Sequence, residues 1–225
     1  MLQNLSRRGL ILFGALIVQS QAYSQAPMPN ITINPARLQA SVSFKTQQFK
    51  PTDCAIVESC VSGSGKRSML KFDVQTPNIG DADLYLGNPA DHPELFIYSP
   101  CHGHYHLLGY AIYELLKLDS TPVKVGGNAV VGHKQAFCLE DLSQVDPSAG
   151  PAKYTCSNQG ISVGWSDVYG SYLDCQWIDI TGVAPGGYLL RVTINGGLYG
   201  NHVFAESNYA DNVATVPVTI PKRFQ

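Results

Sequence analysis

The chain has 225 residues, of which 44% are hydrophobic, and its 15 basic and 17 acidic side chains give a formal net charge of −2. This length and apolar content suit one β-rich domain with a packed core. The lack of a basic stripe excludes nucleic acid and an anionic membrane surface as expected partners, and no apolar run reaches the roughly 20 residues of a membrane span.

The N-terminal segment has the composition of a secretory signal. Arg7 and Arg8 precede an apolar run over residues 9–18, and small residues follow it. A charged start, a short apolar centre and small residues at a cleavage site are typical of a signal peptide. We expect residues 1–24 to be removed on export, with cleavage after Ala26 as the alternative. Both the Sec route and the twin-arginine route stay open.

The rest of the chain, residues 25–225, shows the pattern of one domain made of short strands. No window has a sustained 3.6-residue apolar repeat, and Gly, Pro and Asn separate the apolar runs. Short apolar runs separated by turn-forming residues predict an all-β fold, an antiparallel β-sandwich with long loops. Pro217 favours an edge position for the last strand. The expected strands are 37–49, 69–74, 82–86, 104–116, 188–194 and 213–220, and the expected long loops are 119–132 and 143–164.

Six cysteines, an even number, occur in this exported chain. Disulfides form and persist in oxidising compartments, so the count predicts three bridges and a secreted or periplasmic location. Long loops inside a compact domain are usually functional or cross-linked, which fits such bridges. Sequence spacing alone leaves their pairing open.

Three histidines, His102, His104 and His106, occur at a spacing of two. In an extended strand this spacing places all three side chains on one face. Neutral imidazole binds copper, zinc, iron and nickel, so the cluster predicts a transition-metal site without choosing the metal. A histidine-rich surface strand without a metal is the competing interpretation.

Two more motifs accompany the block CHGHYH at 101–106. They are GHKQAFCLED at 132–141 and DVYG at 167–170, which leads into DCQWIDIT at 174–181. With the three blocks in this order and spacing, the sequence from about Leu38 to Ile220 resembles the catalytic domain of the lysyl oxidase family.

The resemblance implies both a metal and an organic cofactor. It implies that His102, His104 and His106 bind one copper ion. It further implies that Lys134 and Tyr169 become cross-linked as lysine tyrosylquinone, so that residues 25–225 form a copper amine oxidase domain. A partly buried lysine loses its charge readily, which would let its amine add to an oxidised tyrosine ring.

The activity that the resemblance implies is the oxidative deamination of primary amines to aldehydes. Dioxygen is consumed, and ammonia and hydrogen peroxide are released. The expected substrates are peptidyl lysine or small amines. The family pairing would also give the bridges Cys54–Cys101, Cys60–Cys175 and Cys138–Cys156.

The chain departs from animal members of the family in several places. A histidine seven residues after the last copper ligand, considered there for proton transfer, is here Tyr113. The general base is therefore unassigned, and Asp167, Asp174 and Asp179 are the candidates. Without a long pro-segment or a scavenger-receptor module before the domain, we expect a compact, microbial member.

Two other function classes compete with an amine oxidase. An exported copper- or zinc-binding protein for metal handling would keep the histidines but would not need Lys134 or Tyr169. An immunoglobulin-like binding module would keep the fold and need no metal. The presence of both Lys134 and Tyr169 in the chain favours the oxidase.

Overall fold

The computed structural model describes residues 26–132, 138–197 and 200–224. The expected signal peptide, residues 1–24, and Lys134 lie outside the described residues. None of the helices in the described ranges has the length and apolar character that crossing a membrane requires.

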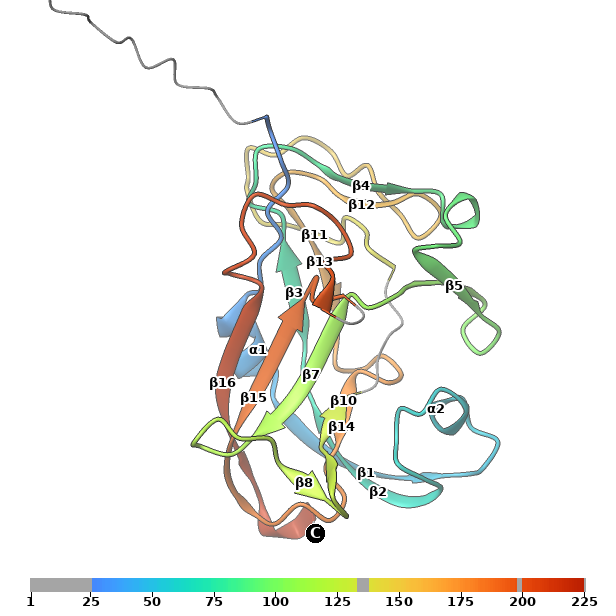
Figure 1. The fold of residues 1–225 in the computed structure, drawn as a ribbon, viewed down its shortest axis with the longest axis vertical. Coiled ribbons are helices and arrows are strands. Elements are labelled where there is room, and N and C mark those ends of the chain that lie inside the picture. The colour runs from blue at the N-terminus through green and yellow to red at the C-terminus, as the bar shows by residue number, and fades with distance from the viewer. Residues whose placement is uncertain (1–25, 133–137, 198–199, 225) are drawn as a thin grey trace, which may run out of the picture.

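The described chain is built mainly of antiparallel strands in several sheets (Figure 1). The largest sheet has the order β10 (Val131–Gly132), β7 (Ala111–Leu116), β15 (Gly186–Ile194) and β16 (Val213–Ile220). A three-stranded sheet has the order β1 (Ser43–Phe49), β2 (Gly65–Lys71) and β14 (Trp177–Asp179). Another has the order β11 (Ser143–Gln144), β13 (Trp165–Tyr169) and β3 (Val74–Pro77).

Three two-stranded ribbons and a few short helices complete the fold. The ribbons pair β12 (Gln159–Ile161) with β4 (Leu84–Gly87), β5 (Phe96–Ser99) with β6 (His104–Leu107), and β8 (Lys124–Val125) with β9 (Asn128–Ala129). The helices are α1 (Pro35–Ser41), α2 (Cys54–Val57) and the 3₁₀ turns η1 (Pro89–Asp91) and η3 (Lys222–Phe224). The ribbon β5–β6 and α2 both lie on the right of the sheets in Figure 1.

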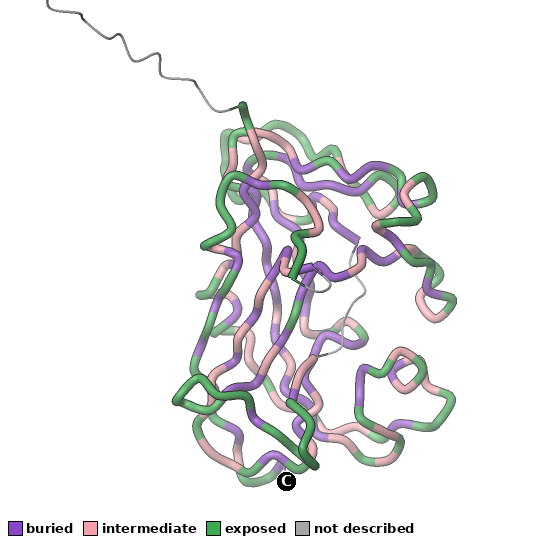
Figure 2. Tube along the Cα trace, in the orientation of Figure 1, coloured by how far each residue is buried: buried purple, intermediate pink, exposed green. Residues whose placement is uncertain are grey.

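The larger of two hydrophobic clusters in the described residues joins the sheets. Leu115, Leu190 and Val216 of the largest sheet belong to the same buried cluster as Leu70 of β2 and Val74 of β3. Buried segments follow the strands, while much of the connecting chain at the periphery is exposed (Figure 2). The predicted all-β antiparallel fold is therefore confirmed.

The stretch 37–49 is only partly a strand. Its first residues belong to α1, and β1 begins at Ser43. The side chain of Asn34 caps the helix by accepting the backbone N–H of Arg37 at 3.1 Å, and Pro35 occupies the first turn. Both are favoured at a helix start. The strand prediction is wrong for these residues because a helix of seven residues is too short to show an apolar period.

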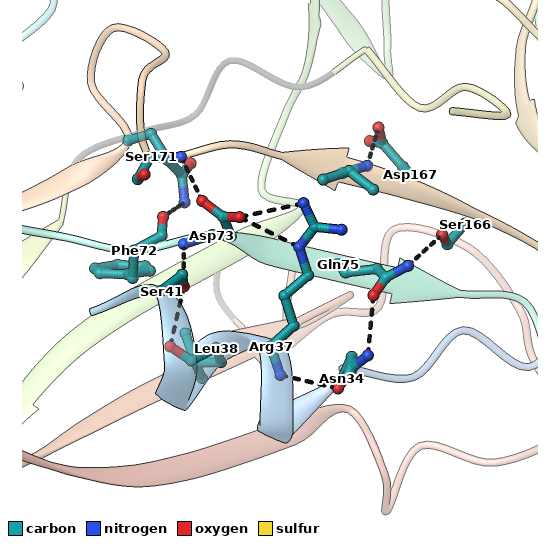
Figure 3. A network of polar contacts seen from close by, with 12 residues as sticks. Asn34, Arg37, Leu38, Ser41, Phe72, Asp73, Gln75, Ser166, Asp167 and Ser171 are labelled. Atoms are coloured by element: carbon teal, nitrogen blue, oxygen red, sulfur yellow. Dashed lines mark hydrogen bonds and ion pairs between the residues drawn. The ribbon is translucent and has the colours of Figure 1, made fainter. Parts of the chain in front are cut away.

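Polar contacts hold α1 against the strands (Figure 3). Arg37 pairs with Asp73 at 3.2 Å, and the side-chain amide of Asn34 donates to Gln75 at 2.9 Å. The second carboxylate oxygen of Asp73 accepts the backbone N–H of Ser171 at 2.7 Å. Asp73 therefore links α1 to the chain that leaves β13.

The segment 104–116 forms two strands, β6 and β7, instead of the one long strand that its apolar character predicts. Gly109, between them, has a φ of +67°. This left-handed conformation suits glycine, which has no Cβ to clash. The long-strand prediction is wrong because the glycine turns the chain out of the β5–β6 ribbon and into the largest sheet.

The last strand lies at the edge of its sheet, as Pro217 predicts. β16 ends the order β10-β7-β15-β16, and Pro217 lies opposite Leu189 of β15. Proline has no N–H to donate to a second neighbour, so it is tolerated there. The expected long loops carry short strands of their own, namely β8, β9 and β10 in the first and β11 and β12 in the second.

All six cysteines form disulfides, in the three pairs that the family resemblance implies. Each bridge closes a loop of the chain and so restricts the unfolded state, which typically contributes about 2–4 kcal/mol to stability. The pairs are Cys54–Cys101, Cys60–Cys175 and Cys138–Cys156.

Candidate metal centre

The three histidines lie together at the start of β6. Their ring centroids are 5.8 Å apart for His102 and His104, 5.3 Å for His102 and His106, and 4.9 Å for His104 and His106. His104 and His106 belong to β6, but His102 lies in the turn before it. The expectation that one strand carries all three is wrong for His102. Gly103, with a φ of +70°, turns the chain there.

Glu58 contacts this cluster from a distant part of the sequence. It follows α2, and its Oε2 lies 2.8 Å from Nε2 of His102. Its Oε1 accepts the hydroxyl of Ser99 at 2.5 Å. Burial raises the pKa of Glu58, but the hydrogen bonds from Ser99 and His102 outweigh it and hold that pKa below its usual value.

Sequence reasoning missed Glu58, because it lies 44 residues before His102 in the chain. Its position between Cys54 and Cys60 is the only local signal. The sulfur of Cys175 also lies within 4.8 Å of the ligand atoms of Glu58 and His102. This sulfur is bonded to Cys60, so it is not a thiolate that could bind a metal.

Tyr169 ends β13 with its side chain buried. Its hydroxyl donates to the carbonyl oxygen of Cys138 at 3.1 Å and accepts the backbone N–H of the same residue. Burial, helped by the nearby charge of Asp167, raises the pKa of the Tyr169 phenol well above its usual value. Cys138 comes four positions after Lys134 in the sequence.

A pocket of about 170 Å³ brings these elements to one place. Its lining combines imidazoles, the phenol of Tyr169 and two carboxylates. The described lining residues are His102, His104, Cys138, Glu140, Cys156, Tyr169, Leu173 and Asp174. A larger hollow of about 580 Å³, lined by Lys117, Lys124 and Tyr188 among others, contains no histidine or carboxylate in its lining. We therefore take the smaller pocket as the site.

The structure separates the three aspartates that sequence reasoning left open. Asp174 belongs to the described pocket lining, whereas Asp167 and Asp179 do not. Asp179 instead accepts hydrogen bonds from the backbone and hydroxyl of Ser62, at 2.9 and 2.8 Å. The pocket adds Glu140, which sequence reasoning did not single out as a base.

Tyr113 lies in the core and is also outside the described pocket lining. It is 1% exposed, and its hydroxyl donates to Oε1 of Gln176 at 3.1 Å. Burial raises the pKa of this phenol far above its usual value. In this chain the Tyr113 side chain is therefore part of the packed core.

Comparison with known proteins agrees with the motifs. A family model described as lysyl oxidase matches residues 29–223. The chain is similar to lysyl oxidase homolog 2 of Xenopus tropicalis, Bos taurus and Homo sapiens, with 36%, 34% and 33% identity over 197, 220 and 218 residues. These alignments cover 82%, 91% and 92% of the chain but only 24%, 26% and 26% of the relatives. The chain thus spans about a quarter of the length of these relatives. Because the family model matches nearly all of the chain, the chain belongs to the lysyl oxidase family.

Proposed function

We propose that this protein is an exported copper amine oxidase whose organic cofactor is lysine tyrosylquinone, formed from Lys134 and Tyr169. The observation that carries the proposal is the pocket shared by Tyr169 and two of the clustered histidines. A metal and an oxidisable phenol must lie close together for such a cofactor to form. The domain is residues 25–225, and residues 1–24 are the signal peptide.

The donor set fits copper. The centroids of the three imidazoles lie 4.9–5.8 Å apart, and the rings would have to rotate to bring one nitrogen of each to a single ion about 2 Å away, since the described group whose ligand atoms already lie within 4.8 Å of one another is Glu58, His102 and Cys175. For a given nitrogen site, affinity favours Cu(II) over Zn(II). His102, His104 and His106 would hold the ion, and copper would supply the oxidising chemistry that converts the tyrosine.

The surroundings of Tyr169 support a need for the metal. Burial raises the pKa of the Tyr169 phenol well above its usual value. A cation bound nearby would favour the phenolate instead. Cys138 holds the hydroxyl in place through its backbone, and Lys134 is close to Cys138 in sequence. These contacts orient the ring that the lysine amine would join.

The pocket carboxylates suit proton transfer from an amine substrate. Burial raises the pKa of Glu140, which makes it a stronger base than an exposed carboxylate. Glu140 would accept a proton from the carbon that bears the substrate amine, and the quinone, once formed, would supply the electron sink for the oxidation. Asp174, exposed at the rim, attracts the cationic amine.

Substrate, product and location follow from this chemistry. The substrates are primary amines, either lysine side chains of proteins or small amines, together with dioxygen. Aldehyde, ammonia and hydrogen peroxide are the products. Three disulfides support a secreted or periplasmic location, because such bridges persist in oxidising compartments.

Mass spectrometry of copper-loaded protein tests the proposal. After treatment with phenylhydrazine, which traps quinones, and proteolysis, we expect one labelled species that joins the peptides of Lys134 and Tyr169. Two separate unmodified peptides from fully copper-loaded protein would point instead to a metal-handling protein. Failure to bind copper at all would favour a binding module.

Replacing Glu140 with glutamine tests the assignment of the base. A lost general base typically slows the chemical step about 10²- to 10⁴-fold. We expect Glu140→Gln to lower the rate of amine oxidation within that range while copper content and hydrazine labelling stay normal. Asp174→Asn should mainly raise the KM for a cationic amine. An oxidation rate unchanged in Glu140→Gln would contradict the assignment.

A further inference from the structure

We infer that Glu58 is a positioning residue that orients the imidazole of His102 by accepting its Nε2–H, which leaves Nδ1 of His102 to bind the metal ion. The inference rests on the proposed metal site but does not depend on the quinone. It assigns a role to a residue outside the three sequence motifs and specifies which ring nitrogen serves as ligand.

The contacts of Glu58 are arranged around His102 and Ser99. Oε2 of Glu58 lies 2.8 Å from Nε2 of His102, and Oε1 accepts the hydroxyl of Ser99 at 2.5 Å. The oxygen of that same hydroxyl accepts the backbone N–H of His102 at 3.3 Å. The carboxylate and the serine therefore hold both the ring and the backbone of His102.

The segment that carries Glu58 is itself fixed at both ends. The backbone N–H of Glu58 donates to the carbonyl oxygen of Cys54 at 2.8 Å, at the end of α2. Cys54 is bridged to Cys101, the residue directly before His102, and Cys60 is bridged to Cys175. The distance between the carboxylate and the imidazole is thus set by covalent links as well as by packing.

The chemistry of the pair determines the ring nitrogens. A carboxylate only accepts hydrogen bonds, whereas a neutral imidazole has one N–H donor and one lone pair. If Nε2 donates to Glu58, the lone pair is on Nδ1, and that nitrogen is the one available to a metal. A carboxylate acceptor also makes the ligating nitrogen more basic and stops the ring from rotating.

The competing role for Glu58 is that of a direct metal ligand. Its half-buried carboxylate is close enough to His102 for both to share an ion. The two roles differ in what they require of residue 58. Positioning needs an acceptor oxygen, which glutamine keeps, whereas ligation relies on the negative charge, which glutamine lacks.

Copper affinity in matched variants separates these roles. Removing a carboxylate that orients a ligating histidine typically weakens metal binding about 10- to 100-fold. By chelator competition we expect Glu58→Ala to fall in that range and Glu58→Gln to keep most of the affinity. Glu94→Gln is the matched control, because Glu94 also contacts a histidine, His92, at 3.1 Å, but outside the described pocket lining.

Either of two results would overturn the inference. Glu58→Ala could bind copper as tightly as Glu94→Gln, which would remove the positioning role. Alternatively, Glu58→Gln could lose as much affinity as Glu58→Ala, with an altered copper EPR spectrum, which would make Glu58 a ligand.

Nitrogen NMR of the unmodified sequence tests the ring assignment even if Glu58→Ala fails to fold. In ¹⁵N-histidine-labelled protein loaded with Zn²⁺, a diamagnetic substitute for copper, we expect His102 to be metal-bound through Nδ1 and protonated at Nε2. Binding through Nε2 would overturn the inference. Absence of metal from all three histidines would overturn it together with the proposed oxidase, whereas a missing Lys134–Tyr169 cross-link would affect the oxidase alone.

Discussion

Replacing His104 with alanine should leave a folded protein that holds almost no copper, forms no quinone and has no detectable amine oxidase activity. Two imidazoles would remain. The ring that is lost has its centroid 4.9 Å from that of His106 and 5.8 Å from that of His102. The effect on stability should be small, because His104 is exposed and its removal opens no cavity.

The measurements are copper content by elemental analysis, hydrazine-reactive quinone, and oxidation of a primary amine. His92→Ala is the control, since His92 contacts Glu94 and is outside the described pocket lining. It should keep full copper and full quinone. A His104→Ala protein with normal quinone content would show that the ligand set is not the three histidines.

Replacing Tyr169 with phenylalanine should leave copper bound while the quinone and all oxidase activity disappear. Phenylalanine keeps the buried ring but has no oxygen to oxidise. The backbone of Cys138 loses its partner as well, so we expect a stability loss of about 1–3 kcal/mol. Lys134→Arg should also keep copper and form no cross-link, because a guanidinium does not lose its proton.

Tyr113→Phe provides a matched control for this stability loss. Tyr113 is equally a buried tyrosine whose hydroxyl has a protein partner, the side chain of Gln176. In thermal unfolding, the Tyr113→Phe protein should lose about as much stability as the Tyr169→Phe protein, but it should keep the quinone. If Tyr113→Phe also lacked the quinone, the loss in Tyr169→Phe would reflect damage to the fold and not removal of a cofactor precursor.

Local sequence patterns predicted the features that depend on neighbouring residues. The spacing of the histidines predicted a shared strand correctly for His104 and His106 but not for His102, and Pro217 indicated an edge strand, because strand geometry and the missing N–H are local properties. The helix α1 and the break at Gly109 were missed. A helix of seven residues is shorter than a readable apolar period, and one glycine inside an apolar run is compatible with either a strand or a turn.

The contacts between distant residues at the site could not be predicted from local sequence. Glu58 reaches His102 across 44 positions, and Glu140 and Asp174 line the same pocket although they come from different sequence motifs. Such contacts depend on the whole topology. The three aspartates were equivalent in sequence, and only the fold separates Asp174 at the pocket from Asp179, which hydrogen-bonds to Ser62.

The two bridges that hold the Glu58 segment have a consequence for when the protein can mature. Cys54–Cys101 and Cys60–Cys175 join parts of the chain that are 47 and 115 residues apart. In a reducing compartment these links are open, and the carboxylate is not fixed beside its imidazole. If the proposed metal site is correct, both bridges would have to form before the Glu58 carboxylate is held beside His102, so metal binding there would follow oxidative folding.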